Sequence, residues 1–207
     1  MPTHRPDVTI FPAARADRDR TAAVLAAAFA TDPHTVAMLP PGDQDGRLRR
    51  MFTAMFDEAM AAGGDVHVAA DAASGDLLGV GVWDAPGASV PTLASLRSVP
   101  AHVRVFGRRI VDAARSEHAA HLHRPQVPHW YLRLLGTTPA ARGRGVAGAL
   151  LADRFAAADA ARVGCYLESS TQANVPFYER HGFVVRGEVP AYGTTPAIGM
   201  WRPPTGG

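Results

Sequence analysis

Lysine is absent from this chain of 207 residues, so arginine supplies all 21 basic side chains. Together with abundant alanine and proline, this absence indicates a GC-rich coding genome rather than a function. The formal net charge is only +2, and so small a charge gives no electrostatic basis for binding nucleic acid or an anionic membrane. We therefore expect no nucleic acid and no membrane among the partners.

Cysteine and long apolar runs are also scarce. The single cysteine, Cys165, excludes an internal disulfide framework. No apolar run is long enough to span a bilayer, and residues Met1 to Arg5 lack the apolar core of a signal peptide. These absences predict a cytoplasmic protein, and they leave both a monomer and a homodimer open.

Histidine, by contrast, gathers in one place, at His118, His121, His123 and His129. No cysteine or carboxylate cluster completes a set of metal ligands beside them. Cationic side chains are favoured at a helix C-terminus, so we interpret the first three as the end of a helix and predict no metal. His129 enters the next strand, and we keep it as a candidate near the reacting atoms.

The apolar periodicity predicts one domain over residues 1–207. Strands are expected at 8–11, 66–70, 77–83, 130–137 and 163–169, and helices at about 17–29, 45–62 and 101–121 and after residue 146. Asp17 should cap the first helix, and Asp32-Pro33 should end it. Residues 85–128 are expected to form a helical segment on the substrate side.

The order of elements after residue 129 predicts the fold class. A strand, a glycine turn, a helix and a second strand imply that 130–137 and 163–169 are parallel neighbours. We expect these two strands to splay at their carboxyl ends. The predicted fold is α/β (α+β in some schemes), with a mixed, strongly twisted sheet of about seven strands flanked by helices.

The glycine turn at 142–148 has the chemistry of an anion site. Gly143, Gly145 and Gly148 let the backbone approach a ligand without obstruction by Cβ atoms. The turn opens a helix, whose first N–H groups are unpaired and carry part of a positive charge. A phosphate or pyrophosphate fits such a site, and Arg142 and Arg144 add charged donors at its rim.

Two known phosphate-binding motifs fit this turn poorly. Gly143-x-Gly145-x-x-Gly148 matches the dinucleotide fingerprint, with Glu168 near the expected ribose-binding position. In that fold, however, the strand runs almost directly into the first glycine, whereas residues 138–142 intervene here. A Walker loop is excluded because no lysine follows the glycines.

A third pattern fits better. Arg142-x-x-Gly145-x-Ala147 matches the first signature of the GNAT acyltransferases, and Asn174 with Phe177-Tyr178-Glu179-x-x-Gly182-Phe183 matches the second. The chain therefore resembles this superfamily. Leu167 to Ser170 and Val175 to Arg180 make it similar to the puromycin N-acetyltransferase type. The resemblance is strongest over 130–188 and weakest over 85–128.

The resemblance implies acetyl-CoA as the co-substrate. Its pantetheine would lie along the strand like an added strand, and its pyrophosphate would sit on the glycine turn. The cofactor-binding residues implied are Leu135, Gly136, Thr137, Arg142, Gly143, Arg144, Gly145, Val146, Ala147, Asn174 and Tyr178. Tyr178 falls on the superfamily's general-acid position. A tyrosine with a pKa of about 10 can protonate a departing thiolate.

The remaining candidates come from position and residue type. Glu168 lies at the carboxyl end of its strand, where α/β sheets place ligands, so it is the candidate general base. A strand bulge is expected at 135–137, where it would offer an N–H to the developing oxyanion. The candidates for the walls or charge of a substrate pocket are Phe29, Asp32, Trp83, Asp84, His129, Trp130 and Tyr192.

The predicted function is transfer of acetyl from acetyl-CoA to a primary amine of a small molecule, such as an antibiotic or an amino-nucleoside-like compound. The amine would attack directly in a ternary complex. Two alternatives stay open: acetylation of a peptide or protein amine, and a non-catalytic module that binds acyl-CoA.

Overall fold

The computed structural model describes residues 8–87, 93–191 and 195–205, and only the backbone of 93–98. The described residues form one mixed sheet in the order β1-β2-β3-β4-β5-β7-β6. Its strands are β1 (Val8–Pro12), β2 (Asp65–Asp71), β3 (Leu77–Asp84), β4 (His129–Thr137), β5 (Gly164–Ser169), β6 (Val184–Val189) and β7 (Ala197–Arg202). The predicted seven-stranded mixed sheet is confirmed.

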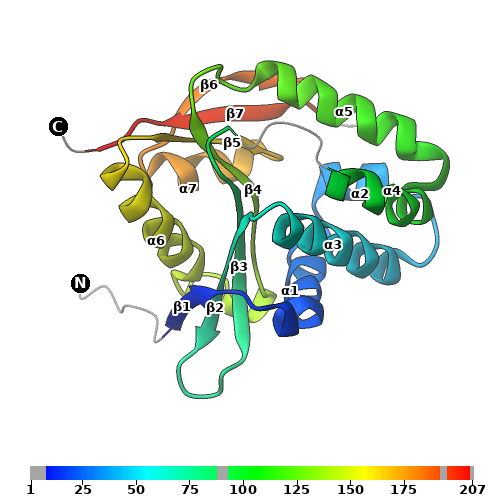
Figure 1. The fold of residues 1–207 in the computed structure, drawn as a ribbon, viewed down its shortest axis with the longest axis horizontal. Coiled ribbons are helices and arrows are strands. Elements are labelled where there is room, and N and C mark those ends of the chain that lie inside the picture. The colour runs from blue at the N-terminus through cyan, green and yellow to red at the C-terminus, as the bar shows by residue number, and fades with distance from the viewer. Residues whose placement is uncertain (1–7, 88–92, 192–194, 206–207) are drawn as a thin grey trace.

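Helices cover both faces of the sheet. They are α1 (Arg18–Phe29), α2 (Pro33–Met38), α3 (Gln44–Ala61), α4 (Leu93–Phe106), α5 (Ile110–His123), α6 (Val146–Ala160) and α7 (Val175–Glu179). Figure 1 shows α6 on one side of the central strands and α1 and α3 on the other. Each side has its own apolar cluster, one built on Phe52 and Leu25 and the other on Leu151 and Phe183.

The parallel pair β4 and β5 is the feature that the sequence predicted most specifically, and it is confirmed. All other neighbouring strands are antiparallel. β4 and β5 pair only from His129 opposite Gly164 to Leu132 opposite Leu167. Beyond these pairs β4 continues along β3, and β5 continues along β7. The two strands therefore separate at their carboxyl ends.

The bulge in β4 lies elsewhere than predicted. Leu134 faces Val82 and Leu132 faces Trp83, so Arg133 between them has no partner in β3. The expectation of a bulge at 135–137 is therefore wrong, because Leu135 to Thr137 pair regularly with β3. Gly136 does not form a bulge but allows α1 to pack closely against β4. A Cβ atom there would lie 2.9 Å from the Cβ of Ala28.

Two predictions about helix ends agree with the structure in position, since Asp17 is the N-cap of α1 and α1 ends at Phe29, but they differ in detail. Asp17 does not cap α1 with its side chain; its carboxylate accepts the backbone N–H of Ala14. Asp32 begins α2 rather than ending α1, since its carboxylate accepts the N–H of Thr35. Each aspartate lies three residues from its partner, a spacing that suits the acceptor of a local turn.

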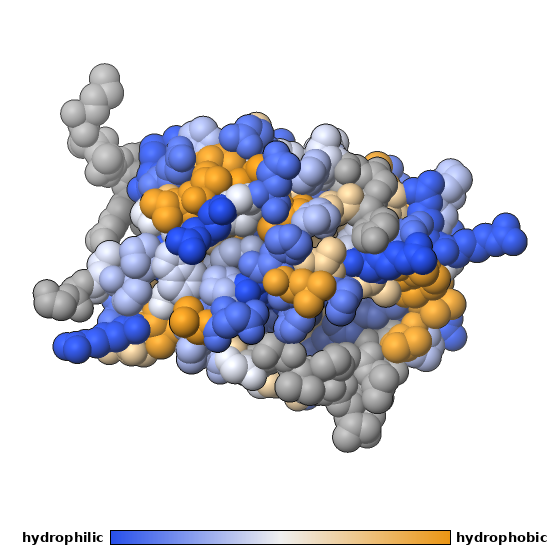
Figure 2. All heavy atoms as spheres, turned by 90° about the horizontal axis from the view of Figure 1, so that it is seen from above, coloured by the Kyte–Doolittle hydropathy of each residue, from blue (hydrophilic) through white to orange (hydrophobic). Residues whose placement is uncertain are grey.

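The single helix expected at 101–121 is two helices, α4 and α5. Gly107 separates them with a φ of 53°, a left-handed conformation that suits glycine. No helix in the described ranges is long and apolar enough to cross a membrane. On the face shown in Figure 2, hydrophobic residues form several separate patches among hydrophilic ones.

The packing of α1 on β4 generates a stability prediction. Gly136→Ala places a methyl group within 2.9 Å of Ala28 and 3.1 Å of Leu25. Overpacking of this kind costs about 1–3 kcal/mol, and we expect that loss in the free energy of unfolding measured with urea. Ala28→Gly in the same chain should recover part of the loss in a double-mutant cycle. A variant as stable as the parent would show that α1 is free to shift.

Candidate active site

The separated ends of β4 and β5 define the candidate site. Helix α6 begins shortly after β4 ends, and α7 begins shortly after β5 ends. Glu168 is the first residue of β5 beyond the last parallel pair. The sequence-predicted turn 142–147, Tyr178 and Glu168 therefore belong to elements at the same edge of the sheet.

The start of α6 fits an anionic ligand. Gly143 and Gly145 have φ values of 75° and 78°, and nothing lies within 4 Å of a Cβ built on Gly143. Gly145 is the N-cap, and no side chain caps the helix. The first N–H groups of α6 therefore have neither a helical nor a capping partner. Val146 is buried, so it can offer a ligand only its backbone.

Two other residues of the turn have structural partners. Arg144 donates to Asp71 at 3.2 Å and thereby ties the turn to the β2–β3 hairpin. Gly148 was expected to admit a ligand. Instead, a Cβ there would lie 2.8 Å from Nε2 of His181, so this glycine makes room for the residues that follow α7.

Tyr178 lies half-buried in α7 between two aromatic rings. Its ring centroid is 5.2 Å from that of Phe177 and 5.8 Å from that of Phe183. Burial, and next the charge of Asp32, raise the pKa of Tyr178 to about 12. The phenol therefore keeps its proton at neutral pH. Asp32 also accepts a hydrogen bond from the hydroxyl of Ser170 just beyond β5.

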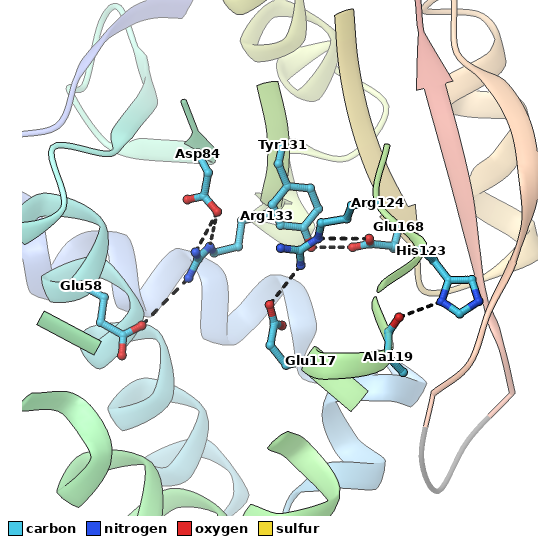
Figure 3. Close-up of polar contacts among 9 residues, drawn as sticks. All are labelled: Glu58, Asp84, Glu117, Ala119, His123, Arg124, Tyr131, Arg133 and Glu168. Carbon is cyan, nitrogen blue, oxygen red and sulfur yellow. Dashed lines mark hydrogen bonds and ion pairs between the residues drawn. The ribbon is translucent and has the colours of Figure 1, made fainter. Parts of the chain in front are cut away.

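Glu168 lies in a polar cluster on the opposite face from α6, shown in Figure 3. One carboxylate oxygen accepts the hydroxyl of Tyr131, and the other lies 3.5 Å from Nε of Arg124. The guanidinium of Arg124 also stacks 3.8 Å from the ring centroid of Tyr131. Burial raises the pKa of Glu168, while Arg124 and Tyr131 act in the opposite direction.

A second ion pair adjoins this cluster. Arg133, the bulged residue of β4, donates to Asp84 at 2.7 Å and lies 4.0 Å from Glu58 of α3. Figure 3 shows this group beside the group around Arg124. Asp84 was a candidate for holding a cationic substrate, but in this structure its carboxylate is paired with Arg133.

Two predicted pocket residues belong to the packing of the fold. Trp83 is 1% exposed and meets Phe155 edge-on at 6.4 Å, so its ring is part of the core and not a pocket wall. His129 lies at the paired end of β4, away from the opening. It packs against Tyr166 and Trp201 at 5.8 and 6.2 Å. Burial lowers the pKa of His129.

The other predicted residues have varied environments. Phe29 packs at 5.3 Å against Phe52 in the core on the α1 side. Trp130 lies beneath the guanidinium of Arg154 at 4.4 Å. Asn174 is exposed just before α7. Tyr192 lies outside the described residues.

Sequence reasoning missed Arg124, Tyr131, Arg133 and Ser170. A signal was present in β4, where a tyrosine and an arginine interrupt an otherwise apolar run at alternate positions. Alternate residues of a strand share a face, although the bulge at Arg133 alters that alternation locally. Nothing in the sequence indicated that Arg124, from the segment before β4, would reach Glu168.

Comparison with known proteins agrees with this geometry. Residues 102–185 match the family model described as an acetyltransferase (GNAT) domain. A structure titled histone acetyltransferase HPA2 and related acetyltransferase, from Corynebacterium glutamicum, is 33% identical with a TM-score of 0.77. The match covers 97% of this chain and 98% of that one. The chain belongs to the GNAT acetyltransferases. It is an acyl-CoA-dependent N-acetyltransferase, and the resemblance found in its motifs is confirmed at that level.

More distant structures show the same fold. Arylalkylamine N-acetyltransferase 2 from Aedes aegypti is 13% identical with a TM-score of 0.67, and the match covers 96% of this GNAT chain and 99% of that one. A GCN5-related N-acetyltransferase from Rhodopseudomonas palustris is 15% identical with a TM-score of 0.56, covering 94% of both chains. GNAT acetyltransferases use acetyl-CoA and act on amines. Among the described residues, no group of histidine, cysteine, aspartate and glutamate side chains could hold a metal ion.

The effect of the Asp32 charge on Tyr178 generates a titration prediction. Asp32→Asn removes the negative charge that disfavours the phenolate, so the pKa of Tyr178 should fall below about 12. It should stay above the ordinary value because burial is the larger cause. The pKa of Tyr178 is measured by following phenolate absorbance against pH. The part of the signal that disappears in Tyr178→Phe belongs to Tyr178. The exposed Asp45→Asn is the matched control, and an equal pKa in both aspartate variants would contradict the prediction.

Proposed function

We propose that this enzyme transfers the acetyl group of acetyl-CoA to a primary amine of a small molecule by direct attack in a ternary complex. Tyr178 is the general acid and Glu168 the general base. The observation that carries the proposal is the separation of β4 and β5, with Glu168 as the first residue of β5 beyond their last pair. The uncapped start of α6 lies at the same edge.

The residues present fit acetyl-CoA. Beyond Leu132, the edge of β4 that faces β5 has no strand partner, so its backbone groups are free to pair with an amide-bearing chain. This supports Leu135, Gly136 and Thr137 as the pantetheine-binding strand. The start of α6, at Arg142 to Ala147, supplies N–H groups for the pyrophosphate. We place Asn174 beside them, on its position before α7.

Acetyl-CoA supplies an activated acyl carbon and a thiolate leaving group. In this proposal Glu168 takes a proton from the acceptor ammonium, so that the nitrogen lone pair becomes available for attack. A backbone N–H from the unpaired part of β4 is the donor for the developing oxyanion. Tyr178, which is protonated at neutral pH, donates its proton to the departing thiolate.

Residues 85–128 form the substrate side of the single domain in this proposal. Arg124, just after α5, and Glu117, within α5, lie at the Glu168 cluster. Helical cover of this kind supports a bounded pocket and hence a small acceptor. We place Asp32 near the acceptor because it adjoins Tyr178, and Phe29 on the same side because it lies against Gly136. The motif at 167–170 and 175–180 supports membership of the puromycin N-acetyltransferase type.

A protein or peptide amine is the second candidate. It is favoured by one observation, the 33% identity to a structure whose title names a histone acetyltransferase. The two candidates differ in the acceptors that release thiol from acetyl-CoA. A thiol-release assay across small primary amines and lysine peptides separates them, and release with peptides alone would replace the proposal.

The glycine turn generates a binding prediction. Gly145→Glu puts a side chain and a negative charge into the proposed anion site, at a φ of 78° that glycine tolerates best. Calorimetry should show no binding of acetyl-CoA at concentrations that saturate the wild type. Gly63→Glu is the matched control, because Gly63 has a φ of 67° and open space around it. Wild-type affinity in a folded Gly145→Glu protein would place the phosphates elsewhere.

The general acid generates a kinetic prediction. Tyr178→Phe removes one hydroxyl and keeps the ring that packs on Phe177 and Phe183. General acid catalysis contributes about 10²–10⁴ in rate, so kcat should fall by that factor, while acetyl-CoA affinity and melting temperature stay near wild type. Turnover within a few-fold of wild type, with chemistry rate-limiting, would remove Tyr178 from the mechanism. A lower melting temperature with turnover kept would assign it to packing.

A further inference from the structure

The guanidinium of Arg124 fills a small site beside the proposed general base. It lies 3.8 Å from the ring centroid of Tyr131, and its Nε lies 3.5 Å from Glu168. Its Nη2 lies 3.0 Å from Glu117. The side chains of Arg124 and Glu168 are only 12% and 9% exposed. We call Glu168, Tyr131 and Glu117 the cation box.

The cation box has the composition that binds organic cations. A carboxylate beside an aromatic face attracts an ammonium as well as a guanidinium. The hydroxyl of Tyr131 donates to the second oxygen of Glu168, so this carboxylate is held in place independently of Arg124. The box can therefore persist when another cation replaces the guanidinium.

The cation box lies beside the proposed general base, so its occupant affects whether the acceptor amine can bind there. Glu168 is the first residue of β5 after the parallel pairing with β4 ends, and in the proposed function it takes the proton of the acceptor. Arg124 therefore occupies the position that an acceptor ammonium needs. This step rests on the proposed function.

The contacts of Arg124 allow its guanidinium to move away from Glu168. It follows α5 in a segment where residues 121–123 and 126–128 are exposed. Its closest carboxylate contact is with Glu117, which is 69% exposed, whereas its contact with the buried Glu168 is longer. Arg124 can thus keep a partner at the surface while it withdraws from Glu168.

Arg202 provides a comparison, because its guanidinium is held by several short contacts. Arg202 binds both oxygens of Asp159 at 2.8 and 2.7 Å, stacks 4.0 Å from the ring centroid of Phe155, and contacts Thr205. It extends from within β7. Both arginines combine a carboxylate with an aromatic face, but only Arg124 comes from an exposed connection and contacts its buried carboxylate through one long distance.

We propose that Arg124 is an internal cation that occupies the acceptor subsite in the free enzyme and is displaced by the ammonium of the substrate. Displacement brings the ammonium proton to Glu168, and the freed nitrogen lone pair forms the bond to the acetyl carbon. The carbon–sulfur bond breaks as the thiolate takes the proton of Tyr178, and the second proton that the nitrogen loses on becoming an amide returns to the Tyr178 phenolate. The site then selects amines that arrive as cations, since a neutral molecule does not replace the charge of Arg124.

Arg124→Ala tests the proposal. An occupant present in about nine-tenths of the free enzyme weakens apparent binding about tenfold, so the variant should lower the KM for the amine by about tenfold or more. Methylguanidinium should bind the variant in calorimetry and compete with the amine, and it should do both about tenfold more weakly with wild type. Neutral methylurea should not bind. Glu168→Gln added to the variant should abolish binding of methylguanidinium.

The controls separate the outcomes. Arg202→Ala removes the similar arginine beside Asp159, and it should leave both the amine KM and the competition by methylguanidinium at their wild-type values. Arg124→Gln, which keeps part of the stem, repeats the test if the alanine variant fails to fold. A tenfold rise in amine KM that methylguanidinium reverses would overturn the proposal, because Arg124 would then be a permanent part of the substrate complex. Failure of methylguanidinium to bind folded variants would also overturn it.

Calorimetry with methylguanidinium requires no turnover, so it is independent of the proposed function. If no amine releases thiol from acetyl-CoA with any protein, the proposed function fails. Binding of methylguanidinium at the Glu168-dependent site that is about tenfold tighter in Arg124→Ala than in Arg202→Ala would still show that the cation box accepts a free cation.

Discussion

The separation of two parallel strands is the constraint on which the site depends. β4 and β5 share only four residue pairs, and Glu168, the start of α6 and α7 all follow the point where those pairs end. The continuation of β4 along β3 keeps the strand straight enough to present a free edge, while β5 turns away with β7. The bulge at Arg133 lies at this point, so the loss of pairing on one side of β4 coincides with an irregularity on the other.

Much of this arrangement could be predicted because it depends on local sequence. Glycines at 143 and 145 are required by left-handed φ values, and the apolar face of α6 follows from its periodicity, with Leu150, Leu151 and Phe155 buried. Two strands joined by one helix made the parallel pair predictable. The turn and Glu168 were predicted as candidates for the same reason, since each lies at the end of an element that its own residues define, whereas Tyr178 was predicted from the motif resemblance.

The errors concern contacts between distant segments. Trp83 was a candidate pocket wall because an aromatic residue at a strand end suits that role, but alternation along β3 places it in the cluster with Leu151 and Phe155. His129 was expected near the reaction, yet the splay begins three residues further along β4. The contact of Arg124 with Glu168 spans 44 positions of sequence, and no periodicity within either segment encodes it.

The small number of pairs between β4 and β5 has a mechanical consequence. In the strand order, β1 to β4 form one half of the sheet and β5, β7 and β6 form the other. The apolar cluster around α1 and α3 lies with β2 and β3, whereas the second cluster joins both halves, since it contains Leu132 and Leu167. In the sheet these two halves meet along a short seam whose open end is where the substrates are expected. Local opening starts where backbone pairing is sparse. A ligand bound along the free edge of β4 would supply the backbone hydrogen bonds that a strand would otherwise make there. The protein would therefore be most rigid in its ligand-bound state.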